Sequence, residues 1–82
     1  MESNPLLQAA TGIVLLRERQ KRQLTQQALA DQAGIQRVYV VGIEGGKRSV
    51  SLAVIFALCH ALGMIPSEFV RKVQEEMVRR RK

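Results

Sequence analysis

The stretch that decides the fold is residues 25–44, which read TQQALADQAGIQRVYVVGIE. Thr25 can begin a helix there, because its hydroxyl can accept a hydrogen bond from an unpaired backbone N–H of the first turn. Gly34 can end that helix in the left-handed conformation, which costs glycine nothing sterically. Val40 and Ile43 lie three residues apart and predict a second helix over the rest of the stretch. The stretch therefore predicts two short helices joined by a tight turn, the helix-turn-helix arrangement.

The flanking sequence contains residues that typically begin and end helices, and they predict three more helices. The first is predicted to start after Pro5 and to run to about Arg22. The fourth begins at a Ser51 cap and ends at Gly63, and the fifth opens at Pro66. No segment alternates apolar and polar residues, so no strand is predicted. The expected fold class is all-α, a compact five-helix domain with a central helix-turn-helix.

Length, cysteine content and charge limit the classes of protein. A chain of 82 residues forms one domain at most and is marginally stable without help. A single cysteine excludes an intramolecular disulfide framework, which leaves oligomerisation as the expected source of extra stability. The net charge of +6 favours a polyanionic partner, either nucleic acid or an anionic membrane surface, although a merely solvated basic surface stays open.

The sequence shows neither an export signal nor a membrane segment. Acidic Glu2 stands where a signal peptide needs positive charge. The longest stretch without a charged residue, Ser49–Ser67, is interrupted by polar residues, glycine and proline, so we interpret it as containing a buried core helix. We therefore expect a cytoplasmic protein without a membrane partner.

Catalytic and cofactor sites are not indicated. Cys59 and His60 are adjacent, but neighbouring helical residues point about 100° apart. Cys59 falls on the apolar face and is interpreted as a small buried hydrophobe, and no further Cys or His could complete a metal site. We therefore expect no enzymatic activity, no cofactor and no small-molecule effector.

Short motifs over more than half of the chain resemble a known family. They are Leu24–Ala30, Ala33–Ile35, Tyr39-Val40, Ile43-Glu44, Gly46–Arg48, Ser51-Leu52 and Ala61–Gly63. With their spacing, they resemble the Cro/C1-type (XRE) helix-turn-helix repressors. The resemblance implies a lambda-repressor-like DNA-binding domain over residues 1–82, with a family-like core at about 24–70 and a helical basic extension at 71–82.

Residues 37–44 (RVYVVGIE) narrow the resemblance to the controller proteins of restriction–modification systems, which are similarly short and read Arg-x-Tyr-x-x-Gly-Ile-Glu here. The implied function is a transcription regulator that binds double-stranded DNA sequence-specifically, as a dimer on a palindromic operator, and times restriction–modification gene expression. Two alternatives stay open: a protein-interaction module, such as an antitoxin or anti-repressor that keeps the fold, and a basic amphipathic segment on a membrane surface.

The implied arrangement assigns DNA contacts to individual residues. Arg37 would face the major groove early in the recognition helix, where a guanidinium can pair with guanine O6 and N7. Gln26 would lie at the positive N-terminal end of the preceding helix, which suits a phosphate. The resemblance to controller proteins implies that Arg48 also reads bases. The expected base contacts are Gln36, Arg37, Val38, Tyr39 and Arg48. The expected phosphate contacts are Gln26, Gln27, Lys47 and Ser49.

Some positions depart from the family pattern. Val38, Val41 and Gly42 stand where many members carry polar residues, so direct readout is expected to be thin and shape readout more important. Glycine inside a helix lowers helix stability by about 1 kcal/mol relative to alanine. Either a close approach of DNA or simple tolerance would explain why Gly42 stands there. Glu18 falls on a position that is apolar in the family, which leaves the register of the first helix open. The basic residues within 17–22, which are Arg17, Arg19, Lys21 and Arg22, are expected to form a solvated face rather than a DNA contact.

Surplus apolar residues on the last two predicted helices indicate a homodimer. Family members usually carry polar residues on the outer face of the fourth helix, where this chain has Ala53, Val54 and Ala57. Exposed apolar patches usually mark an interface, and two-fold pairing would place two recognition helices about 34 Å apart, one turn of DNA. The expected interface residues are Val54, Ala57, Val70, Val73 and Met77. In the open alternative, the tail folds back over this patch within the monomer.

Overall fold

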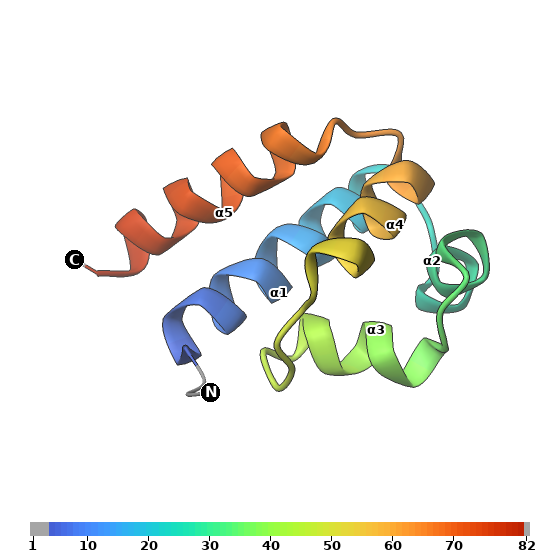
Figure 1. The fold of residues 1–82 in the computed structure, drawn as a ribbon, viewed down its shortest axis with the longest axis horizontal. Coiled ribbons are helices and arrows are strands. Elements are labelled where there is room, and N and C mark those ends of the chain that lie inside the picture. The colour runs from blue at the N-terminus through green and yellow to red at the C-terminus, as the bar shows by residue number, and fades with distance from the viewer. Residues whose placement is uncertain (1–3, 82) are drawn as a thin grey trace.

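The computed structural model describes residues 4–81, and within them it contains five helices and no strand (Figure 1). The predicted all-α, five-helix class is therefore confirmed. Two residues of the sequence-based expectations lie outside the described range: Glu2, whose acidic side chain is the reason to expect no export signal, and Lys82, the last residue of the basic extension. The helices are α1 (Pro5–Lys21), α2 (Gln26–Ala33), α3 (Arg37–Glu44), α4 (Leu52–Leu62) and α5 (Pro66–Arg80).

The predicted caps and stops set the helix boundaries. The Thr25 hydroxyl accepts a hydrogen bond from the backbone N–H of Ala28 at 3.0 Å, and the Ser51 hydroxyl accepts one from Val54 at 3.1 Å. Gly34 and Gly63 end α2 and α4 in the left-handed conformation, with φ of 71° and 73°. Both helices of the central pair are therefore short because their ends are encoded locally.

The core lies between α1, α5 and the three shorter helices. Figure 1 shows α5 running alongside α1, with α3 at the opposite end of the molecule from α5. Phe69 and Val73 turn inward from α5, and Cys59 is fully buried in α4, which confirms its interpretation as a small buried hydrophobe. Burial raises the pKa of the Cys59 thiol, which keeps it protonated.

Glu18 settles the register of α1. It occupies a buried position, as the family pattern indicates, but it is satisfied there by ion pairs with Lys21, Arg22 and Lys72 at 2.8–3.0 Å. Burial by itself would raise the pKa of Glu18, but the hydrogen bonds from these cations outweigh it and lower the pKa from 4.5 to about 2. Lys72 belongs to α5, so the buried carboxylate joins the two long helices.

The expected solvated face at basic residues 17–22 is only partly right: Arg17 and Lys21 are more than half exposed, but Arg19 and Arg22 are not. Arg17 pairs with Glu76 of α5 at 2.7 Å, and Arg22 donates hydrogen bonds to Glu18 and to the backbone carbonyl of Leu62. Arg19 turns toward α3, and only 12% of its side chain is exposed. Arg17, Arg19 and Arg22 therefore attach this part of the chain to α5, α3 and α4, respectively, whereas Lys21 pairs only with Glu18 of its own helix.

None of the helices within residues 4–81 is by itself long and apolar enough to cross a membrane. Only α4 and α5 taken together reach that length and composition, and a bend of 106° separates them.

Replacing Glu18 with Gln should lower the free energy of unfolding at neutral pH by about 1–3 kcal/mol, the scale of hydrogen bonds to charged groups. The pKa of Glu18 is lower in the folded chain than in the unfolded one. Its stabilisation is therefore present above about pH 4.5 and is lost as the pH falls toward 2. Urea unfolding followed by circular dichroism at a series of pH values measures both effects.

Glu75→Gln is the matched control, because Glu75 pairs with Arg71 on α5 and both side chains are more than half exposed. That substitution should change stability little. If Glu18→Gln proves as stable as the wild type at neutral pH, the buried network does not stabilise the fold as argued.

Candidate nucleic-acid interface

The angle between α2 and α3 is fixed by a buried carboxylate. Glu44, at the end of α3, accepts two hydrogen bonds from the guanidinium of Arg19, at 2.7 and 3.1 Å, and one from the amide of Gln26 at 3.0 Å. The same guanidinium donates to the backbone carbonyl of Leu24, just before α2. This cluster, here called the Glu44 clamp, therefore joins α1, α2 and α3 at one point.

α1 also approaches α3 closely at Gly12. A Cβ at this position would run into the carbonyl oxygen of Ile43 and would lie 2.8 Å from that of Glu44. Only glycine allows the two backbones to lie so near, so any side chain here would push α3 outward. Val40 and Ile43 are fully buried on the inner face of α3, and their packing fixes its rotation.

The outer face of α3 carries the expected base contacts. Gln36, Arg37 and Val38 are exposed along its first turn, and Tyr39 is partly buried at its edge. Gln36 is the N-cap residue, but its side chain makes no capping hydrogen bond. Val38 and Val41 leave an apolar strip on this face, with 60% and 39% of each residue exposed.

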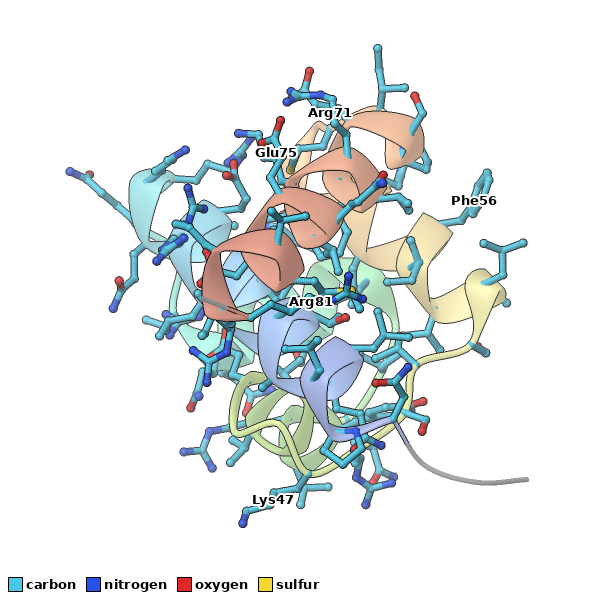
Figure 2. The ribbon with its side chains drawn as sticks, turned by 90° about the vertical axis from the view of Figure 1, so that its left-hand side faces the viewer. Lys47, Phe56, Arg71, Glu75 and Arg81 are labelled. Atoms are coloured by element: carbon cyan, nitrogen blue, oxygen red, sulfur yellow. The ribbon has the colours of Figure 1, made fainter. Side chains whose placement is uncertain are left out.

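Cations without an acidic partner gather around α3. Within residues 4–81, the seven cations that form ion pairs lie between Arg17 and Arg22 or between Arg71 and Arg79, whereas Arg37, Lys47 and Arg48 form none. Figure 2 shows Lys47 extending from the end of the molecule opposite Arg71 and Glu75. Arg80 and Arg81, at the end of α5, are the other described cations outside these pairs. The positive charge at α3 is therefore not neutralised by any acidic side chain within residues 4–81.

The four expected phosphate contacts lie around this face, but three of them are already engaged. The Gln26 amide donates to Glu44, and the Gln27 amide donates to Asp31 at 2.8 Å. The Ser49 hydroxyl accepts a hydrogen bond from Gln8 at 2.8 Å. Lys47 is exposed and makes no such contact within the described residues. An amide group has two N–H donors, so Gln26 and Gln27 each keep one for a phosphate.

Sequence reasoning missed the residues that position this face. Arg19 was assigned to a solvated surface, and Glu44 and Gln8 were given no role. Glu44 belongs to the family-like motif at the end of α3, so an acidic residue at this place could be recognised from the sequence. Its partner lies 25 residues earlier in the chain, and a one-dimensional pattern cannot identify that pairing.

The expected dimer surface is only partly available. Val73 is buried in the core of the chain itself, so it is corrected from an interface residue to a core residue. Val54, Ala57 and Met77 are partly buried, and Val70 is half exposed. Leu52 and Phe56, also on α4 and not among the expected interface residues, are 69% and 55% exposed. Figure 2 shows Phe56 pointing away from the body of the protein.

A groove of about 410 Å³ lies beside this surface, between the start of α1 and α5. Its apolar lining includes Leu7, Val50, Ile55 and Val70, and the polar residues of its rim include Arg48. No group of three or more His, Cys, Asp or Glu side chains that could hold a metal ion occurs in the part of the chain that the structure describes. Cys59 is buried and His60 is exposed, so the two do not form a joint site.

Comparison with known proteins agrees with this geometry. The helix-turn-helix family matches residues 15–70, which extends the family-like region toward the N-terminus relative to the motifs. The control protein C.MunI from a Mycoplasma species is 34% identical over 58 residues, which cover 71% of this chain and 78% of that protein.

Solved structures of controller proteins superpose well. The restriction–modification controller protein C.AhdI from Aeromonas hydrophila is 39% identical, with a TM-score of 0.74, over 76% of this chain and 94% of that chain. The controller protein C.Esp1396I, solved as a tetramer in complex with its natural 35 base-pair operator, has a TM-score of 0.81 over 94% of this chain and 99% of that one. At 23% identity it supports the fold alone.

The paired short helices, the exposed face of α3 and the match over residues 15–70 lead to one assignment: the chain belongs to the helix-turn-helix family that includes the restriction–modification controller proteins.

Proposed function

We propose that the chain is a sequence-specific regulator of transcription that binds double-stranded DNA with α3 in the major groove. The observation that carries the proposal is the sorting of charge: Arg37, Lys47 and Arg48 have no acidic partner within residues 4–81, and all three lie on α3 or directly after it. A cluster of unneutralised cations around an exposed helix is the electrostatic footprint of a nucleic-acid site. The whole chain then acts as one DNA-binding domain.

The contacts divide into two kinds. Gln36, Arg37, Val38, Tyr39 and Arg48 are proposed to face base edges, and the guanidinium groups are suited to guanine. Lys47, Ser49 and the free amide hydrogens of Gln26 and Gln27 are proposed to face phosphates. The apolar strip of Val38 and Val41 can contact thymine methyl groups but offers no hydrogen bonds, so part of the specificity rests on DNA shape.

A homodimer is proposed to form through α4 and α5. Leu52 and Phe56 lie four residues apart and share one face of α4, whereas Val54 lies on the opposite side of that helix and Ala57 lies between the two sides. Val70 and Met77 supply the α5 side, and the groove lined by Leu7 and Val50 can receive an apolar side chain from the partner. Exposed apolar surface of this extent is unusual on a monomer. A two-fold dimer would bind a palindromic operator with two α3 helices one turn of DNA apart.

The relatives named above suggest the biological role. By analogy with control protein C.MunI and C.AhdI, we propose that the chain controls expression of restriction–modification genes in the cytoplasm, without an enzymatic activity of its own. A second candidate is a protein-interaction module that retains the fold, which the exposed Val38 and Val41 favour. The two functions differ in one observation: only a regulator enriches a single sequence from a randomised double-stranded DNA library.

Arg37→Ala should weaken binding to the selected operator by about 1–3 kcal/mol and weaken binding to random DNA much less, because the guanidinium reads a base. Lys47→Ala should weaken binding to the operator and to random DNA to a similar degree, because an ammonium group on a phosphate carries no sequence information. It should also reduce the salt dependence of binding by about one released ion, because one phosphate is no longer neutralised. Fluorescence anisotropy at several salt concentrations measures both quantities.

Equal losses for Arg37→Ala on operator and random DNA would remove Arg37 from the base contacts. Failure of the wild type to enrich any sequence from the library would overturn the proposed function as a whole.

Phe56→Glu should convert the protein to a monomer and strongly weaken operator binding, because a carboxylate would be buried in the apolar interface. Sedimentation equilibrium at micromolar concentration measures the mass. Val41→Glu is the matched control, since it places the same charge on an exposed valine of α3. That variant should remain a dimer although its DNA binding is impaired. A wild-type mass near the 9.2 kDa of one chain would show that the dimer proposal is wrong.

A further inference from the structure

Gly42 lies inside α3, where glycine weakens a helix relative to alanine. Its backbone does not require glycine, because the positive φ angles among the described glycines occur at Gly34, Gly46 and Gly63. The sequence alone left a close approach of DNA or simple tolerance as explanations. The structure offers a third, which lies in the neighbouring side chain.

The side chain of Arg48 lies directly across Gly42. A Cβ at position 42 would lie 2.9 Å from Nε of Arg48, 3.0 Å from Cδ and 3.1 Å from Cγ. The part of the Arg48 side chain from Cγ to Nε therefore lies over the bare backbone of the helix at Gly42. Gly12 differs, because an added Cβ there would meet backbone oxygens.

The guanidinium of Arg48 ends over the ring of Tyr39, with 5.1 Å between Cζ and the ring centroid, within the range of a cation–π contact. Tyr39 and Gly42 are three residues apart and therefore share one face of α3. Gly42 therefore lies under the aliphatic part of the Arg48 side chain, and Tyr39 lies under its guanidinium group.

The loop that carries Arg48 is also fixed. The backbone N–H of Lys47 donates to the carbonyl of Gly42 at 2.9 Å, which folds the loop back onto α3. On the other side of Arg48, the Ser49 hydroxyl accepts a hydrogen bond from Gln8 of α1 at 2.8 Å. Both neighbours of Arg48 are therefore anchored, and only its side chain needs further positioning.

We infer that Gly42 is a positioning residue for Arg48: the missing Cβ lets the arginine cross α3 and hold its guanidinium on Tyr39, beside the face that enters the DNA. This inference rests on the proposed function. Pre-organisation lowers the conformational entropy that a flexible arginine loses when it binds a base. Gly42 thus shapes sequence specificity without touching DNA.

The test is a double-mutant cycle between Gly42→Ala and Arg48→Ala, with fluorescence anisotropy on the operator that the wild type selects from a randomised library. Gly42→Ala should weaken operator binding about tenfold, within the range for one arginine–base contact. In the Arg48→Ala background the same substitution should have almost no further effect. The thermal midpoint of Gly42→Ala should stay equal or rise, because alanine favours the helix and the flexible arginine can move aside.

Gly45→Ala is the matched control. A Cβ there would make only ordinary contacts, of which the nearest is the Val41 carbonyl at 3.4 Å, and none with Arg48. A second readout needs no DNA: in NMR spectra of the free protein, the Arg48 δ-protons should be shifted upfield by the Tyr39 ring. That shift should disappear in Gly42→Ala and persist in Gly45→Ala.

Two results would overturn the inference while leaving the proposed function intact: an undiminished effect of Gly42→Ala in the Arg48→Ala background, or unchanged Arg48 proton shifts in Gly42→Ala. If the wild type selects no operator, the proposed function fails, and the NMR comparison still decides whether Gly42 positions Arg48.

Discussion

The structure depends most on the Glu44 clamp. One buried carboxylate accepts hydrogen bonds from Arg19 of α1 and from Gln26 of α2, and it stands on the last residue of α3. Helices as short as α2 and α3 are not stable alone in water, so their orientation must come from tertiary contacts. Because hydrogen bonds between charged groups are strong and directional, the clamp fixes the angle between the two helices more tightly than apolar packing alone would. The outward orientation of the exposed face of α3 follows from that angle.

The clamp belongs to a wider division of charge. Glu18, Glu44 and Glu76 are all buried or nearly so, and each pairs with one cation that is distant in the sequence: Lys72, Arg19 and Arg17, respectively. Three hydrogen-bonding cations keep the pKa of Glu18 at about 2, so it remains ionised at neutral pH despite its burial. These three acids therefore hold helices together. The described cations outside the ion pairs lie in two places: Arg37, Lys47 and Arg48 lie on α3 or in the loop after it, and Arg80 and Arg81 lie at the end of α5.

The sequence predicted local features well and long-range ones poorly. Caps such as Thr25 and stops such as Gly34 act within a few residues, so helix number and boundaries could be read directly. The sequence showed Glu18 at a position that is apolar in the family. Its partner Lys72 lies 54 residues away, and local sequence patterns cannot predict a contact between residues so far apart in the chain. The exposed apolar residues of α4 were missed for a related reason: α4 is apolar on all sides, so periodicity cannot tell Phe56, which faces solvent, from Leu58, which is buried. Gly42 was likewise explained only when the path of Arg48 was visible.

The central claim is that two copies of α3 occupy the major groove at neighbouring half-sites. Dimethyl sulfate protection on the selected operator tests it most directly, because this reagent methylates guanine N7 in the major groove and adenine N3 in the minor groove. The account predicts protected guanines in two clusters whose centres lie about one helical turn apart, related by the symmetry of the site. Protection of adenine N3 alone, or a single cluster of protected guanines, would contradict it.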